Sequence, residues 1–168
     1  MCGIVGYVGE KQAANFLIDG LTKLEYRGYD SAGIAVFDGE KINVVKSVGR
    51  LAALKEKIKN NTPEGVMGIG HTRWATHGRP SDVNSHPHTD CSGKFAIVHN
   101  GIIENFMSLK EELIAKGHKF VSETDTEVVA HLIEDVYEGD FVEAVNKVLN
   151  RIEGSYSLAF MCQDYPDT

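Results

Sequence analysis

Apolar positions in the first part of the chain change from strand-like to helix-like spacing and back. A short apolar run at residues 1–8 predicts a first strand. Apolar residues at helical spacing follow and end at Gly28, a natural helix stop, which predicts a helix packed on that strand. Residues 32–37 and 42–48 are typical of strands, and Asp38-Gly39 between them is a strong hairpin signal. At least one strand pair is therefore expected to be antiparallel.

The middle of the chain contains a long segment without periodicity. A short helix at residues 51–58 and a polar loop lead into an apolar strand at residues 66–70. Residues 71–90 are polar and rich in His, Thr, Gly and Pro, and another apolar strand follows at residues 95–99. Loops of this length in a compact domain are commonly functional. We therefore predict a substrate-binding loop held between two strands.

The second half of the chain is predicted to be mainly helical. Asn100-Gly101 is typical of a two-residue hairpin turn after the strand. Three helices are expected next, at residues 106–113, 128–136 and 141–152, with Thr124 and Asp140 as caps of the second and third. Residues 156–162 predict a last strand. Since a turn follows that strand at the end of the chain, we expect a C-terminal truncation inside a larger sheet.

Composition and charge narrow the class of protein. Of the 168 residues, 42% are hydrophobic and 24% are charged, which is ordinary for a globular domain. The formal net charge of −7 argues against a nucleic-acid partner, since phosphate binding relies on clustered Lys and Arg. No apolar run approaches the length of a membrane span, so no membrane association is expected. Cys2, Cys91 and Cys162 are too widely spaced for a disulfide framework and favour a reducing, cytoplasmic location.

Cys2 is the strongest candidate for covalent chemistry. If the initiator Met1 is removed, Cys2 carries both a thiol and a free α-amine, whose unperturbed pKa values are about 8.5 and about 7.7–8.0. An N-terminal amine can activate such a nucleophile as its base. The alternative is that Cys2 is a small buried hydrophobic residue of the first strand.

Three other positions offer groups for binding and for charge stabilisation. Arg73 suits bidentate binding of a small carboxylate, although it could instead be a surface residue packed on Trp74. Asn100-Gly101 could present an amide and a backbone N–H to a developing oxyanion as well as form a turn. Asp125 lies near the start of a predicted helix, where it could bind an ammonium group or only complement the helix dipole.

A metal site is a further alternative for the polar loop. Its candidate ligands would be His71, His77, His86 and His88 with Cys91. Their spacing lacks the paired ligands of known zinc modules. Polar loop histidines are the simpler interpretation, and we expect no metal.

Five stretches together resemble the N-terminal glutaminase domain of the class II glutamine amidotransferases. They are residues 24–33, 71–78, 84–88, 99–105 and 122–127. The first two are similar to the branch of that family whose full-length members pass ammonia to fructose-6-phosphate. The resemblance runs from the N-terminus to the C-terminus of the chain.

The resemblance implies a fold and a domain organisation. The expected fold is α+β, an N-terminal-nucleophile hydrolase αββα sandwich of two antiparallel sheets between helical layers. Residues 1–168 would form one glutaminase domain, incomplete at its C-terminus. Sugar-isomerase domains, which bind fructose-6-phosphate, would lie outside the chain, and the full-length enzyme would be a homo-oligomer. No metal or organic cofactor is implied.

The resemblance also implies the roles of individual residues. Cys2 would attack the carboxamide of L-glutamine, and Asn100 and Gly101 would stabilise the oxyanion, leaving a γ-glutamyl thioester that water hydrolyses to glutamate. Arg73 would bind the substrate carboxylate, and Asp125 the ammonium group. The loop residues expected to line the ligand are Trp74, Thr76 and His77. Two alternatives stay open: a non-catalytic glutamine-binding domain, and the glutaminase domain of another class II amidotransferase.

Overall fold

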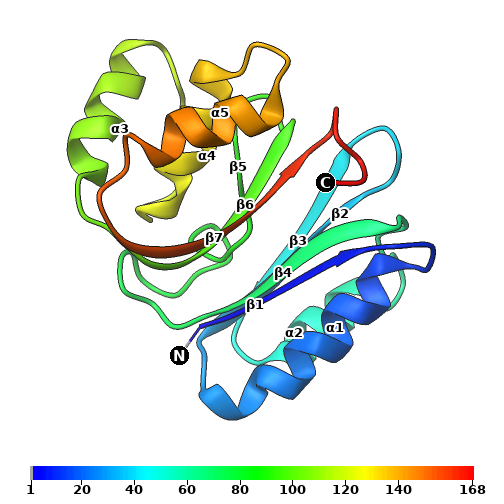
Figure 1. Cartoon of the computed structure of the whole chain (residues 1–168). Coiled ribbons are helices and arrows are strands. Elements are labelled where there is room, and N and C mark those ends of the chain that lie inside the picture. The colour runs from blue at the N-terminus through cyan, green and yellow to red at the C-terminus, as the bar shows by residue number, and fades with distance from the viewer. Residues whose placement is uncertain (1) are drawn as a thin grey trace.

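The computed structural model describes residues 2–168, so Met1 and its predicted removal lie outside the described residues. Two antiparallel β-sheets stack face to face between two layers of helices (Figure 1). The predicted α+β fold, with its αββα layering, is therefore confirmed.

The first sheet has the strand order β1-β4-β2-β3 and is antiparallel throughout. Its strands are β1 (Gly3–Val8), β2 (Ser31–Phe37), β3 (Ile42–Val48) and β4 (Met67–Arg73). The hairpin predicted at Asp38-Gly39 joins β2 to β3, and Gly39 has a φ of 101°, which favours glycine. β4 extends beyond the predicted strand because its polar end also pairs, with Thr72 opposite both Gly3 and Ala32.

Two helices cover the outer face of the first sheet, α1 (Ala13–Leu24) and α2 (Leu51–Ile58). Leucines of both helices pack against Ile34 of β2, and these side chains are fully buried: Leu17, Leu21, Leu51 and Leu54. Burial of each such side chain contributes about 1.5–3 kcal/mol. A short 3-10 turn, η1 (Glu25–Arg27), continues α1, and Gly28 with a φ of 73° ends it as predicted.

The second sheet has the order β5-β6-β7, and three helices cover its outer face. Its strands are β5 (His88–Thr89), β6 (Phe95–Ile103) and β7 (Gly154–Cys162). The helices are α3 (Phe106–Ala115), α4 (Thr126–Val136) and α5 (Phe141–Leu149). None of the helices within residues 2–168 has the length and apolar character needed to cross a bilayer.

One of the two predicted helix caps is present. The side chain of Asp140 accepts a hydrogen bond from the Glu143 N–H at 2.9 Å, which caps α5 as predicted. The predicted Thr124 cap of α4 is wrong, because Asp125 holds the N-cap position and its side chain makes no capping hydrogen bond. The Thr124 hydroxyl instead lies 3.0 Å from His88 Nε2.

Asn100-Gly101 does not form the predicted hairpin turn. β6 continues through both residues to Ile103 and pairs with β7 along its whole length, with Gly101 opposite Tyr156. Gly101 has a φ of 127°, and a Cβ atom there would lie 2.0 Å from the Ser155 carbonyl oxygen. The glycine therefore permits close approach to β7, and pairing along nine residues outweighs a two-residue turn preference.

The inner faces of the two sheets meet in a central apolar layer that includes Phe37, Met67, Val98 and Met161. Because β1 and β4 are antiparallel, the start of β1 lies beside the end of β4. The later half of β6 reaches the same end of the molecule, where Asn100 approaches Cys2. This junction of three strands brings residues distant in the sequence together.

Candidate active site

A pocket of about 260 Å³ lies where the start of β1 meets the ends of β4 and β6. Six of the eight predicted site residues line it: Cys2, Arg73, Trp74, Thr76, Gly101 and Asp125. The remaining two, Asn100 and His77, lie next to it. The lining residues that were not predicted as part of this site are His71, His86, His99, Ile102, Thr124 and Thr126.

Cys2 lies immediately before β1 and presents a half-buried thiol to this pocket. The Trp74 N–H donates to Cys2 Sγ at 3.1 Å. Cys2 Sγ also lies 3.6 Å from the Trp74 carbonyl oxygen, to which the thiol can donate, so the Trp74 backbone fixes the position of the sulfur. The thiol thus faces the pocket, unlike that of Cys162, which is fully buried in the core.

Arg73, the last residue of β4, provides a buried guanidinium group that can still donate to a ligand. Its side chain is 4% exposed, so it is not the surface residue of the alternative interpretation. Nη2 donates to the carbonyl oxygens of His77 and Gly78, the latter at 3.0 Å. Nη1 is 3.9 Å from Asp30 Oδ1 and has no hydrogen-bond partner among the described residues. A buried donor of this kind suits a ligand carboxylate.

Asp125 holds the N-cap position of α4 without capping the helix. Its Oδ2 accepts a hydrogen bond from the Ile103 N–H at 2.9 Å and lies 4.0 Å from His99 Nδ1. Burial lowers the pKa of His99, which therefore supplies no positive charge to this carboxylate near neutral pH. The side chain of Asp125 is 3% exposed and lines the pocket. A buried carboxylate beside a neutral imidazole suits a cationic ligand.

His71 orients the side chain of Asn100, a role that the sequence analysis did not foresee. His71 Nε2 lies 2.8 Å from Asn100 Oδ1. Burial lowers the pKa of His71 to about 4, so the ring is neutral at pH 7. We assign its proton to Nε2, since the amide oxygen accepts. The Asn100 NH₂ group then faces Cys2, with Nδ2 3.5 Å from the Cys2 carbonyl oxygen.

Asp30 fixes the loop after β4. The other predicted site residues of this loop, Trp74, Thr76 and His77, differ in their contacts. The Ala75 N–H donates to Asp30 Oδ2 at 2.5 Å. Trp74 is 57% exposed and, with the exposed Thr76, borders the pocket. The His77 ring packs edge-on against Phe106, with 5.1 Å between ring centroids. The backbone carbonyl of His77 accepts a hydrogen bond from Arg73, which links His77 to the site.

Four buried histidines surround this junction: His71, His86, His88 and His99. The rings of His71 and His86 stack at 4.2 Å between centroids, and His88 lies 4.9 Å from His86. Burial lowers the pKa of all four, which makes them neutral core residues. The interpretation of His71, His86 and His88 as ordinary polar loop residues is therefore wrong.

We expect the protein to lose stability as the pH falls from about 6.5 to about 4. The unfolded histidines bind protons below about pH 6.5, whereas the native pKa of His71 is about 4 and those of the other three are also lowered. The unfolded state therefore binds more protons in this window, and the free energy of unfolding decreases by up to about 1.4 kcal/mol per pH unit for each histidine.

Urea unfolding over a pH series measures this effect. Carboxylates change the free energy of unfolding mainly below about pH 4.3, so the effect of the histidines can be measured separately above that pH. His86→Gln, if it folds, should reduce the slope of the free energy of unfolding against pH by the contribution of about one proton, about 1.4 kcal/mol per pH unit. A free energy of unfolding that is constant from about pH 7 to about pH 5 would contradict the neutral buried rings.

The sequence matches known proteins along its whole length. A family model described as a glutamine amidotransferase domain matches residues 71–166. A curated relative from Caldanaerobacter subterraneus subsp. tengcongensis, glutamine–fructose-6-phosphate aminotransferase [isomerizing], is 62% identical over 167 residues. A relative of the same name from Thermus thermophilus is 54% identical. Both alignments cover 99% of this chain and 28% of the relative, so the chain spans about 28% of those proteins.

Solved structures with this fold include enzymes that use glutamine. The glutamine phosphoribosylpyrophosphate amidotransferase from B. subtilis, complexed with ADP and GMP, superposes with a TM-score of 0.82 at 30% identity. That alignment covers 97% of this chain and 35% of the other. A glutamine aminotransferase class-II domain protein from Silicibacter pomeroyi has a TM-score of 0.64 at 16% identity over 97% of this chain and 73% of the other. The latter shares the fold alone.

Proposed function

The chain belongs to the glutamine amidotransferase domain family, and on that premise we propose that residues 1–168 form a glutaminase domain that hydrolyses L-glutamine to L-glutamate and ammonia. The observation that carries this proposal is the composition of the pocket. A thiol, a buried guanidinium donor and a buried carboxylate, from Cys2, Arg73 and Asp125, line one cavity. Such a cavity suits an amino acid zwitterion whose side chain meets a nucleophile.

In the proposed mechanism, removal of Met1 exposes the α-amine of Cys2. The amine takes the thiol proton, directly or through a water molecule, and Sγ attacks the carboxamide carbon of glutamine. The C–N bond then breaks, the departing ammonia receives the proton, and a γ-glutamyl thioester remains on Cys2. Water hydrolyses the thioester to glutamate. The Trp74 N–H bound to Sγ supports the thiolate during the first step.

The oxyanion of the tetrahedral intermediate is assigned to Asn100 and Gly101. The Asn100 NH₂ group already faces Cys2, and Gly101 lines the pocket beside it. A donor that is oriented before the reaction stabilises developing charge without reorganisation. His71 acts as a positioning residue, because its Nε2–H holds the Asn100 carbonyl oxygen.

Two charged groups are assigned to the α-carbon substituents of glutamine. Arg73 Nη1 would bind the α-carboxylate, and Asp125 the α-ammonium group. Trp74 and Thr76 border the ligand, and His77 contributes through its carbonyl oxygen, which Arg73 holds. Simple amides should be poor substrates, because they lack the groups that would bind Arg73 Nη1 and the Asp125 carboxylate. This reaction requires no metal or organic cofactor.

The longer relatives suggest the fate of the ammonia. We propose that in the full-length protein it passes to fructose-6-phosphate, bound by sugar-isomerase domains outside this chain, as in a glucosamine-6-phosphate synthase. A homo-oligomeric full-length enzyme is part of the same proposal. The cysteines form no disulfide among the described residues, which supports a cytoplasmic location. The alternative of another class II amidotransferase is disfavoured by the 62% identity to a relative of this name.

Glutamate release and intact mass, measured on one preparation, test the proposal. A chain whose mass lacks Met1 should release glutamate and, after acid quenching, carry a γ-glutamyl adduct on Cys2. Full activity in a chain that retains Met1 would contradict the role of the α-amine. Binding of glutamine without release, in a processed sample, would instead favour the non-catalytic binding domain.

A further inference from the structure

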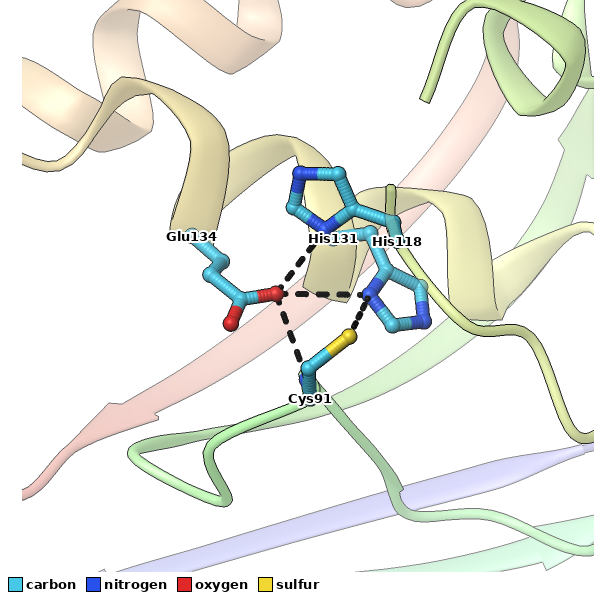
Figure 2. A group of neighbouring side chains, drawn as sticks. All are labelled: Cys91, His118, His131 and Glu134. Atoms are coloured by element: carbon cyan, nitrogen blue, oxygen red, sulfur yellow. Dashed lines mark hydrogen bonds and ion pairs between the residues drawn. The ribbon is translucent and has the colours of Figure 1, made fainter. Parts of the chain in front are cut away.

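A second cluster of ligand-type side chains lies outside the glutamine pocket. Cys91, His118, His131 and Glu134 each contribute one ligand atom, and these atoms all lie within 4.8 Å of one another. Figure 2 shows the four side chains pointing toward one another. None of them lines the pocket. We propose that this cluster is a binding site for a divalent transition metal, with zinc as the preferred ion.

Two of the distances between the ligand atoms match tetrahedral coordination and a third is shorter, so small side-chain movements would complete the geometry. Zinc ligands at about 2.0–2.3 Å from the ion lie about 3.3–3.7 Å from one another in a tetrahedron. His131 Nδ1 is 3.6 Å from Cys91 Sγ and 3.5 Å from Glu134 Oε2. His118 Nδ1 is 3.0 Å from the same Glu134 oxygen. One sulfur, two imidazole nitrogens and one carboxylate oxygen are ligands that zinc accepts.

The outer nitrogens of both rings face carboxylates. His131 Nε2 lies 3.5 Å from Glu127 Oε1, and His118 Nε2 lies 3.8 Å from Asp135 Oδ1. His131 Nε2 is buried and has no hydrogen-bond partner among the described residues, so the Glu127 carboxylate is a group that its N–H could reach. Metal-binding histidines commonly donate their second N–H to such a carboxylate, which fixes the tautomer.

This tautomer leaves the centre of the cluster in need of a cation. With the protons on Nε2, the Nδ1 lone pairs of His118 and His131 both face inward. They then meet the Glu134 carboxylate, which is an acceptor, and the Cys91 sulfur, which is an acceptor in its thiolate form. A metal ion satisfies all four atoms. The competing arrangements need no metal: a proton on Nδ1 of a ring can bind the Glu134 carboxylate, and a Cys91 thiol can donate to His131 Nδ1.

Cys91 is suited to act as the thiolate ligand. Its Sγ accepts a hydrogen bond from the Lys119 N–H at 3.4 Å, which fixes the position of the sulfur. Its own N–H donates to Glu134 Oε2 at 3.2 Å, so the backbone also holds the carboxylate in place. Cys91 is exposed and His131 is buried, so an ion can enter from solvent and remain partly enclosed.

The role that follows from the position of the site is structural. Its ligands come from the loop between β5 and β6, the loop between α3 and α4, and α4 itself. The second of these loops leads into Asp125, and the N–H groups of Val121 and Ser122 already bind Glu127. A metal would fasten the same loop at His118. It would stabilise the folded state, since the four ligands converge only there.

Zinc content after incubation with excess zinc and removal of unbound metal tests the proposal. We expect about one zinc per wild-type chain and at least a tenfold reduction in Cys91→Ala and in His118→Ala. Cobalt should give a thiolate-to-metal charge-transfer band that is absent from Cys91→Ala. Cys2→Ala removes the other accessible thiol and should keep both the zinc and the band.

A thermal melt complements the binding measurement. Zinc should raise the melting temperature of the wild-type chain and of Cys2→Ala, but not that of Cys91→Ala. Cys91 and His118 are not in the core, so both alanine variants should fold. Circular dichroism checks that they do. A folded wild-type chain that retains no zinc would overturn the proposal and favour a cluster held together by hydrogen bonds alone. If Cys91→Ala and His118→Ala retained as much zinc as the wild-type chain, the proposal would be overturned as well.

Discussion

Cys2→Ala should lower glutamate release by about 10⁴- to 10⁶-fold, the loss found when a catalytic nucleophile is removed. Glutamine should still bind with nearly unchanged affinity, because Arg73 and Asp125 remain in the pocket. Isothermal titration with glutamine, together with a glutamate assay on the same sample, separates the two effects. Zinc retention by this variant also shows that its fold and its second site are intact.

Cys2→Ser provides the matched control for the nucleophile. A serine hydroxyl has the size and position for attack, but it is far less acidic than a thiol, so an amine activates it less readily. We expect activity much closer to that of Cys2→Ala than to that of the wild type. Substantial glutamate release by Cys2→Ala would contradict the thioester mechanism, since a water molecule activated elsewhere would then perform the hydrolysis.

Asn100→Ala should reduce kcat by about 10²- to 10³-fold, the cost of one oxyanion donor, while KM changes little. The reason is that the amide meets a full negative charge only in the transition state. Steady-state kinetics with glutamine, in which kcat and KM are determined separately, measure this difference. His71→Ala should have the same signature with a smaller loss of kcat, because His71 acts only by orienting the amide.

A control for Asn100 is available in the same part of the chain. The side chain of Asn105 binds the Arg151 carbonyl oxygen at 2.8 Å and the Glu153 N–H at 3.0 Å, and it does not line the pocket. Asn105→Ala should therefore affect stability without affecting kcat. A selective rise in KM for Asn100→Ala would instead indicate that the amide binds the ground state.

The elements of the fold were largely predictable, because their apolar spacing reflects local packing. α1, the β2–β3 hairpin and β7 follow from periodicity and turn residues. The stacking of two sheets came from the family resemblance, since spacing alone indicated mixed helix and sheet. The turn at Asn100-Gly101 was mispredicted, because its local signal does not report the distant partner strand, in which Tyr156 lies opposite Gly101.

The reactive residues of the candidate site could be predicted from the sequence. The residues that support them could not. Cys2, Arg73 and Asp125 carry chemistry that their residue types suggest. His71 supports Asn100 from another sheet, a contact that no spacing in the sequence encodes. The ligands of the proposed metal site are likewise scattered over residues 91–134. Only His131 and Glu134, three residues apart on α4, have a regular helical spacing.

The two terminal nitrogens of the Arg73 side chain make different contacts. Nη2 holds the carbonyl oxygens of His77 and Gly78, whereas Nη1, which has no hydrogen-bond partner within residues 2–168, is left for a ligand. In the proposed function, the rigid guanidinium group of Arg73 therefore couples the order of the loop to the affinity for glutamine. If glutamine binds as proposed, the coupling is reciprocal: bound glutamine should stabilise the loop, and so slow its amide exchange, by the same free energy by which an ordered loop strengthens glutamine binding. Under the proposed function, retention of the substrate would therefore depend on residues 77 and 78, neither of which lines the pocket.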